Sequence, residues 1–135
     1  SLIFILKKFI YTSNLSAPYM GGISSYGLII MIVAYIQQQE RENKYELASA
    51  ADLLIGFLKF YGYKMNYIMK CIQVNPFNTH EIYTHFIHYY SDPNNPLDFS
   101  EKLVIVDPLN ENNNVGRATH KIKKIQTAFG VAYIN

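Results

Sequence analysis

A short segment near the amino end of the chain joins two glycines and two hydroxyl side chains to an aromatic ring. Its sequence is Gly21-Gly22-Ile23-Ser24-Ser25-Tyr26, and either serine can cap the helix that the next apolar residues predict. Free N–H groups at a helix N-terminus bind phosphate, and glycine lets the backbone come close. Tyr26 can offer its ring face to a nucleobase. An ordinary capped loop with a core tyrosine is the alternative, which the local residues by themselves favour.

The most polar segment of the chain, DPLNENNNVGR, runs from Asp107 to Arg117. It follows the β-branched run 103–106, which predicts a strand that leads into a loop. A carboxamide is both donor and acceptor, as pairing with a nucleobase edge requires, and adenine is its usual partner. Arg117 can fix the loop through Asp107 or contact phosphate. A surface turn in an asparagine-rich protein is an equally good interpretation, whereas Leu109 stands where a calcium loop needs an oxygen ligand.

A loose set of histidines and carboxylates lies in a stretch rich in Tyr and Phe. Its members are His80, Glu81, His85, His88 and Asp92. Because no HExxH pattern accompanies them, we predict no metal site there. The GxSxG, P-loop and GxGxxG patterns are also missing from the sequence, which leaves the hydrolase and P-loop classes without support.

The formal net charge of +2 is too small to indicate a polyanion partner, so any such partner must be bound locally. Lys121, Lys123 and Lys124 lie off the apolar face of the last predicted helix. A solvated face is the first interpretation, and contact with an RNA backbone is the second. A single cysteine, Cys71, excludes an internal disulfide framework and a multi-cysteine zinc site.

Hydrophobic spacing predicts a mainly α domain with a small β component. The 135 residues fit one domain, and with half of them hydrophobic a buried core can form. We expect helices at about 2–13, 24–39, 47–61 and 122–132, with Gly62 ending the third, and a short extended segment at 67–74. Residues 75–100 show no clear period. The uncharged run 21–36 is too short and polar to span a membrane. Because the chain starts at Ser1 without an initiator Met, we expect a piece of a longer protein.

Taken in order, these segments resemble the central domain of the noncanonical poly(A) polymerases and terminal uridylyltransferases, which are DNA polymerase beta-like nucleotidyltransferases. The segments are LKKFIYTSNL, GGISSYGLIIMIVAYIQ, ADLLIGFLKFYGYKMNY and LVIVDPLNENNNVGRATHKIKKIQTAF. They cover nearly the whole chain except about residues 75–100, and GGISSY and DPLNxxNNVGR are specific in combination. The most similar branch is the nuclear, TRAMP-type poly(A) polymerases, also called DNA polymerase sigma. The resemblance implies that residues 1–135 form the helical central, PAP/25A-associated domain, without the catalytic nucleotidyltransferase domain.

The resemblance also implies a role for individual residues. Lys7 and Ser25 match residues that contact the triphosphate, and Tyr26 matches the ring that stacks on the base. In the matched recognition motif Asn113 stands at the base-reading position and Arg117 closes the loop. Family enzymes that favour UTP often carry His in place of Asn113, so Asn implies ATP. The implied nucleotide-binding residues are Lys7, Gly22, Ser25, Tyr26, Asp107, Asn110, Asn113 and Arg117.

The chain departs from the family pattern in three places. Tyr11 stands where some relatives carry a second basic residue, and Val106 stands where the most similar ones carry an acidic residue. The family's Gly-Ser motif and three metal-binding aspartates have no counterpart in the sequence. We therefore assign no catalytic and no metal-binding residue, and we expect this chain alone to be inactive.

As a whole, the resemblance implies the nucleotide-recognition part of a template-independent RNA 3′-end adenylyltransferase, which extends RNA from ATP and releases pyrophosphate during RNA processing, surveillance and decay. Mg²⁺ or Mn²⁺ would bind to the missing catalytic domain. The implied partners are the RNA 3′ end, ATP, that domain and, as in TRAMP-type complexes, a zinc-knuckle RNA-binding protein and an RNA helicase. A nuclear location is implied, with the cytoplasm as the alternative. A terminal uridylyltransferase, a non-catalytic remnant that binds RNA or protein, and an unrelated helical interaction protein are the other candidates.

Overall fold

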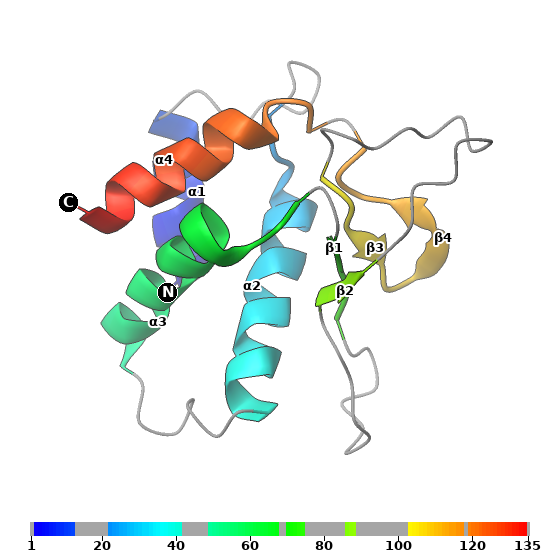
Figure 1. Ribbon diagram of the computed structural model, residues 1–135, viewed down its shortest axis with the longest axis horizontal. Coiled ribbons are helices and arrows are strands. Elements are labelled where there is room, and N and C mark those ends of the chain that lie inside the picture. Colours follow the sequence, from blue (N-terminus) through cyan, green and yellow to red (C-terminus); the bar gives the residue numbers. More distant parts are fainter. Residues whose placement is uncertain are drawn as a thin grey trace.

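The computed structural model describes residues 2–12, 22–41, 49–67, 70–74, 86–88, 103–117 and 119–134. Its helices are α1 (Leu2–Thr12), α2 (Ser25–Arg41), α3 (Ala50–Lys59), the short π-helix η3 (Phe60–Lys64) and α4 (Ile122–Ile134). Its strands form two antiparallel pairs, β1 (Lys70–Ile72) with β2 (Phe86–His88) and β3 (Val106–Asp107) with β4 (Asn110–Asn114). Helices α1, α3 and α4 lie on one side of α2, and both strand pairs lie on the other (Figure 1). The mainly α class with a small β component is confirmed.

Aromatic side chains fill the core between the helices. Phe57 of α3 and Phe129 of α4 are fully buried, and their ring centroids lie 5.5 Å apart in an edge-on arrangement. Tyr61 of η3 is also fully buried, and its hydroxyl donates a hydrogen bond of 2.7 Å to the carbonyl of Met31 in α2. Because buried aromatic residues carry large apolar areas, and a buried hydroxyl needs a partner, this cluster fixes α2, α3 and α4 relative to one another.

Three of the four predicted helices are present where the hydrophobic spacing places them, at 2–12, 25–41 and 122–134. Of the two candidate caps of α2, Ser24 is the one used. Its Oγ accepts a hydrogen bond of 3.0 Å from the backbone N–H of Gly27, and its carbonyl accepts one of 3.0 Å from that of Leu28. The hydroxyl of Ser25 is therefore not needed for capping.

The prediction for the third helix was wrong at both ends. Helix α3 begins after Ser49, which forms a capping box with Asp52, instead of at Leu47, which lies outside the described residues. The chain also continues through Gly62 as η3 instead of ending there. A Cβ on Gly62 would lie 2.7 Å from the backbone nitrogen of Gly130, so this glycine serves the close approach of α4 and does not terminate the helix.

The extended segments differ from expectation in two ways. The extended stretch predicted at 67–74 contains β1, as expected. The run 103–106 is strand only at its end, because Ile105 forms a single parallel bridge to Ile72 and β3 starts at Val106. The asparagine-rich segment expected to be a loop is instead strand β4, which pairs with β3 across an irregular register. Asn is depleted in strands in general, and this composition hid the hairpin. Among the described residues, none of the helices is both long enough and apolar enough to cross a membrane.

Candidate functional site

The amino-terminal turn of α2 and the β3–β4 hairpin meet through one carboxylate. The hydroxyl of Tyr26 donates a hydrogen bond of 2.8 Å to Oδ1 of Asp107, across 81 residues of sequence. Nδ2 of Asn113 donates one of 3.0 Å to Oδ2 of the same carboxylate. The two segments that sequence analysis singled out therefore lie side by side, and we call these three residues the Tyr–Asp–Asn line.

The hairpin turn itself orients the carboxylate of Asp107. The backbone N–H of Leu109 donates a hydrogen bond of 2.9 Å to Oδ1, a turn that Asp side chains commonly form. This backbone N–H, followed by the donors of Asn113 and Tyr26, lowers the pKa of Asp107 below its ordinary value of 3.8. The hydrogen bond from Tyr26 to Asp107 raises the pKa of Tyr26, because a phenol that donates to a carboxylate loses its proton less readily. At neutral pH the line thus holds an ionised Asp107 and a neutral Tyr26.

The ionised carboxylate dictates how Asn113 is turned. A carboxylate only accepts hydrogen bonds, so the NH₂ group of Asn113, and not its oxygen, must face Asp107. The oxygen Oδ1 lies on the other arm of the planar carboxamide, and it accepts no hydrogen bond from the described residues. The carboxamide therefore still offers Oδ1 as an acceptor and the second N–H of Nδ2 as a donor. Tyr26 is 41% exposed, which leaves part of its ring open to a planar ligand.

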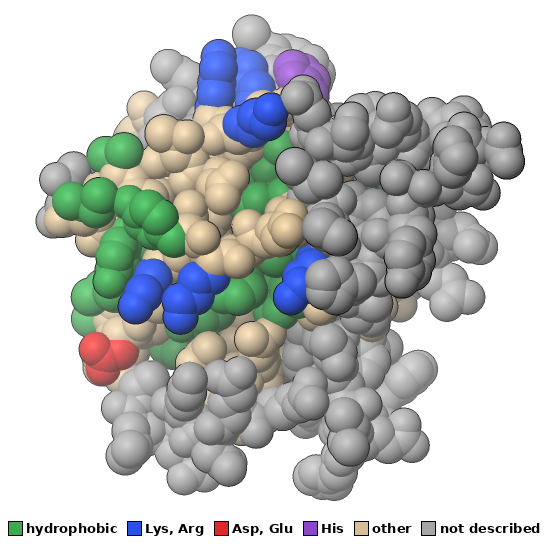
Figure 2. Space-filling view, in the orientation of Figure 1, with side chains coloured by type: hydrophobic (Ala, Val, Ile, Leu, Met, Phe, Trp, Pro, Cys, Tyr) green, Lys and Arg blue, Asp and Glu red, His purple; other side chains and the backbone are tan. Residues whose placement is uncertain are grey.

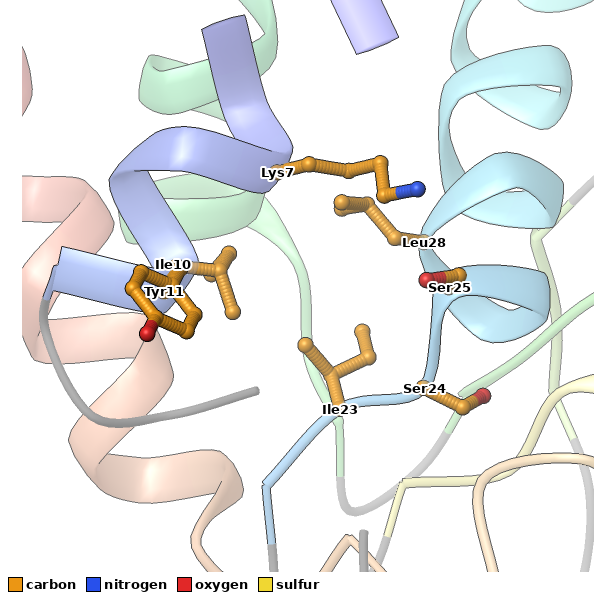
Figure 3. Close-up of a pocket in the computed structure, with 7 residues that line it drawn as sticks. All are labelled: Lys7, Ile10, Tyr11, Ile23, Ser24, Ser25 and Leu28. Atoms are coloured by element: carbon orange, nitrogen blue, oxygen red, sulfur yellow. The ribbon is translucent and has the colours of Figure 1, made fainter. Parts of the chain in front are cut away.

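A cavity of about 290 Å³ lies on the other side of the α2 N-terminus, between α1 and α2. Figure 3 shows the side chain of Lys7 extending from α1 toward the first turns of α2, where Ser25 lies. Lys7 and Ser25 are both exposed, and neither side chain forms a hydrogen bond or an ion pair with the described residues. An ammonium group and a hydroxyl thus converge at a helix N-terminus, an arrangement suited to an anion. The residues that line this cavity are Lys7, Ile10, Tyr11, Ile23, Ser24, Ser25 and Leu28.

The hairpin is closed by a residue that sequence analysis did not select, Asn114. Its Oδ1 accepts hydrogen bonds from the backbone N–H groups of Ile105, at 2.8 Å, and Gly116, at 2.9 Å. Its Nδ2 donates one of 3.1 Å to the carbonyl of Leu103. All the contacts of this half-buried carboxamide are with backbone groups of the hairpin base, so it sets the position of Asn113 beside it. A run of three asparagines gives no signal that distinguishes the third from the second.

The other residues implied by the resemblance, Gly22, Asn110 and Arg117, belong to the same two segments. Gly22 is buried, and its carbonyl accepts a hydrogen bond of 3.3 Å from the hydroxyl of Thr119. Asn110 is an exposed residue of β4. Arg117 is exposed, and its side chain forms no ion pair with any described residue, so its expected closure of the loop stays a prediction beside the contacts that Asn114 makes.

The described residues offer no metal site. Nowhere among them do three or more His, Cys, Asp or Glu side chains gather closely enough to hold an ion. The histidine set 80–92 lies outside the described residues, apart from the backbone of β2. The described site is suited to binding, because it offers a ring face, a carboxamide edge, a cation and a hydroxyl around one helix N-terminus.

Comparison with curated proteins finds polymerases. The chain is 29% identical over 136 residues to the inactive noncanonical poly(A) RNA polymerase protein Trf4-2 of Drosophila melanogaster, which covers 98% of this chain and 32% of that protein. It is 29% identical over 143 residues to the poly(A) RNA polymerase gld-4 of Caenorhabditis elegans, which covers 98% of this chain and 16% of that protein. The chain thus spans a third or less of these relatives. No family model matches it.

Comparison with solved structures shows that the fold is shared with polymerase cores. The polymerase core of TRAMP, an RNA surveillance complex, superimposes with a TM-score of 0.79 at 22% identity, over 98% of this chain and 41% of that one. The Cid1 poly(U) polymerase, solved as a variant with bound MgATP, gives a TM-score of 0.73 at 22% identity, over 98% of this chain and 48% of that one.

Proposed function

Because the homologues of this chain are noncanonical poly(A) polymerases, we propose that it is the nucleotide-recognition part of a template-independent RNA 3′-end adenylyltransferase, acting in RNA processing, surveillance and decay. The observation that carries the proposal is the Tyr–Asp–Asn line, in which Tyr26, Asp107 and Asn113 are joined by two hydrogen bonds. It combines a partly open ring with an oriented carboxamide, which are the two elements needed to hold a nucleobase by its face and by its edge.

The carboxamide of Asn113 suits the edge of adenine. One N–H of its Nδ2 donates to Asp107, which leaves the oxygen Oδ1 and the second N–H of Nδ2 for a base. Adenine presents its N6 amino group as a donor beside a ring nitrogen that accepts, so it can pair with both groups of the carboxamide. We therefore propose ATP as the nucleotide, with a terminal uridylyltransferase as the alternative.

The triphosphate would lie in the cavity between α1 and α2. Lys7 supplies a positive charge on its α1 wall, and Ser25 supplies a hydroxyl at the first turn of α2. Since Ser25 and Tyr26 are neighbours at the start of one helix, they can contact the phosphate end and the base of the same nucleotide. This arrangement positions ATP and does not by itself break a bond.

The rest of the reaction would belong to other parts of the enzyme. Mg²⁺ or Mn²⁺ would bind to a catalytic domain, because the described residues do not fit a metal site, and we assign no step to the ion. The RNA 3′ end and that domain are the proposed partners, together with a zinc-knuckle protein and a helicase as in TRAMP-type complexes, and the nucleus is the proposed location. A non-catalytic remnant is the second candidate, since the Trf4-2 relative is an inactive polymerase.

Nucleotide binding to the 135-residue chain tests the proposal. ATP is compared with inosine triphosphate, which presents a carbonyl oxygen where ATP presents the amino group. We expect ATP to bind about tenfold more tightly, which corresponds to one well-placed hydrogen bond. Tyr26→Ala should weaken ATP binding by at least about fivefold through loss of stacking. Phe4→Ala, which removes an exposed ring of α1 that lies outside the site, is the control. A chain that binds RNA and no nucleotide would support the remnant instead.

A further inference from the structure

The two segments of the nucleotide site are joined at a second point, inside the molecule. The hydroxyl of Thr119, which precedes α4, donates a hydrogen bond of 3.3 Å to the carbonyl of Gly22, which precedes α2. In Figure 1 the light-blue start of α2 lies beside the orange turn that leads into α4. We propose that Thr119 is a positioning residue for base recognition, an inference that rests on the proposed function, and we call its bond to Gly22 the inner bond.

Thr119 is buried, although residues that follow it along the chain face solvent. It is 3% exposed, whereas His120 and Lys124 are exposed, and Figure 2 shows lysine side chains over the start of α4. Apart from tyrosines and Cys71, it is the one polar side chain that the described residues bury. A buried hydroxyl without a partner destabilises a fold, so packing alone would favour an apolar side chain here. The bond to Gly22 therefore accounts for the threonine.

At one end the inner bond is connected to the hairpin through backbone hydrogen bonds. The N–H of Thr119 donates a bond of 3.0 Å to the carbonyl of Gly116. The N–H of Gly116 donates one of 2.9 Å to Oδ1 of Asn114, which is next to Asn113. A Cβ on Gly116 would lie 2.5 Å from the carbonyl oxygen of Leu103, so this turn packs tightly against the segment that leads into β3. Thr119 is thus fixed to the base of the hairpin that carries Asn113.

At its other end the inner bond holds the residues that lead into α2. Gly22 and Ile23 are both buried, and Ser24 caps the helix. Tyr26 follows in the first turn, four residues after Gly22. Because a capped first turn moves as one unit, a displacement of Gly22 also displaces the ring of Tyr26.

The inner bond and the outer bond, from Tyr26 to Asp107, differ in their exposure to water. The outer bond is the shorter, at 2.8 Å against 3.3 Å, but it is exposed, so water can replace it at little cost. The inner bond is buried, and its loss takes a hydroxyl donor away from a buried carbonyl. A base can stack on Tyr26 and pair with Asn113 only if the ring and the carboxamide are correctly spaced. The inner bond sets this spacing.

The test compares Thr119→Val with Thr127→Val in the 135-residue chain, by calorimetric titration with ATP and with inosine triphosphate. Valine keeps the shape of threonine and removes the hydroxyl. Thr127 is the matched control, because its exposed hydroxyl donates a bond of 2.9 Å to the carbonyl of Lys123 within α4. We expect Thr119→Val to lower the preference for ATP from about tenfold to less than about threefold, since the carboxamide no longer meets the base edge squarely. Thr127→Val and the conservative Thr119→Ser should keep the preference.

Two further measurements separate positioning from a general loosening of the fold. Inorganic tripolyphosphate, which has no base, should bind Thr119→Val within about twofold of the wild type, because the flexible side chain of Lys7 can follow Ser25. In a chain that already carries Asn113→Ala, Thr119→Val should not lower the ATP preference further. Equal losses of affinity for ATP, inosine triphosphate and tripolyphosphate in Thr119→Val would overturn the proposal. All titrations are made well below the unfolding midpoint of each variant.

A measurement without nucleotide distinguishes failure of this inference from failure of the proposed function. The ¹³Cζ resonance of the Tyr26 ring reports the outer bond, and Asp107→Ala gives its position when that bond is absent. We expect Thr119→Val to move the resonance at least about half way to that position, and Thr127→Val to leave it in place. A chain that binds no ATP and shows this shift would refute the proposed function and still support the positioning of Tyr26 by Thr119. A chain that binds ATP, with the resonance unmoved in Thr119→Val, would overturn the inference alone.

Discussion

Replacement of Asn114 by Ala tests whether one carboxamide holds the hairpin that carries Asn113. The side chain makes three hydrogen bonds to backbone groups, of 2.8, 2.9 and 3.1 Å. The partners belong to Ile105, Gly116 and Leu103, which are all buried. Each bond contributes about 1 kcal/mol net, and buried groups left unpaired cost more. Because Asn114 is half-buried and water can replace part of its contacts, we expect a loss of about 3 kcal/mol in the free energy of unfolding.

The matched control is the neighbouring residue of the same type. Asn113→Ala removes an exposed side chain whose one hydrogen bond goes to the carboxylate of Asp107, so the loss should stay within about 0.5 kcal/mol. For a chain of this size a loss of about 3 kcal/mol lowers the midpoint of thermal unfolding by about 10 °C. Circular dichroism of the two variants measures the difference. Equal and small shifts for Asn114→Ala and Asn113→Ala would refute the reasoning that Asn114 closes the hairpin.

Two other predictions concern packing and pH. Gly62→Ala places a Cβ 2.7 Å from the backbone nitrogen of Gly130, so the chain should lose about 2 kcal/mol. Gly130→Ala, whose new Cβ meets the Tyr63 ring at 3.2 Å, should cost less in the same urea titrations, and the reverse order would contradict the backbone contact. Folding lowers the pKa of Asp107 below 3.8. The stabilisation of the fold by the ionised carboxylate is therefore complete at neutral pH and is lost as the pH falls through the folded pKa. The stability gap between wild type and Asp107→Asn should therefore shrink between pH 7 and pH 3, and a constant gap would exclude this linkage.

The sequence predicts the helices of this fold well, because their apolar residues recur at helical spacing and the core uses those faces. The sequence also contains a signal for the start of α3, although the hydrophobic pattern alone placed that start at Leu47. Ser49 and Asp52 have the spacing of a capping box, and the structure places the box there. The prediction that Gly62 ends the third helix was wrong because glycine is common both at helix ends and at close backbone contacts, and the sequence does not separate the two.

The candidate site is harder to predict than the helices around it. Local chemistry alone favoured a plain capped loop at Tyr26 and allowed a plain surface turn at Asp107, and only the family resemblance joined the two segments. Their contact spans 81 residues, a distance over which periodicity carries no information. The separate tasks of Asn113 and Asn114 depend on the register of β4, with one side chain toward Asp107 and the other on the backbone at the hairpin base. Because Asn113 and Asn114 are identical neighbours, the sequence alone cannot show which one contacts Asp107 and which one contacts the backbone.

The most direct test of the nucleotide site is an NMR titration of the ¹⁵N-labelled chain with ATP. The account predicts that the side-chain amide of Asn113 and the backbone amides of Ser25, Tyr26 and Asp107 shift together with one dissociation constant. The backbone amide of Lys64 in η3, which does not line the cavity between α1 and α2, should stay in place. A titration in which ATP shifts the amide of Lys64 and leaves Tyr26 and Asn113 unchanged would contradict this site.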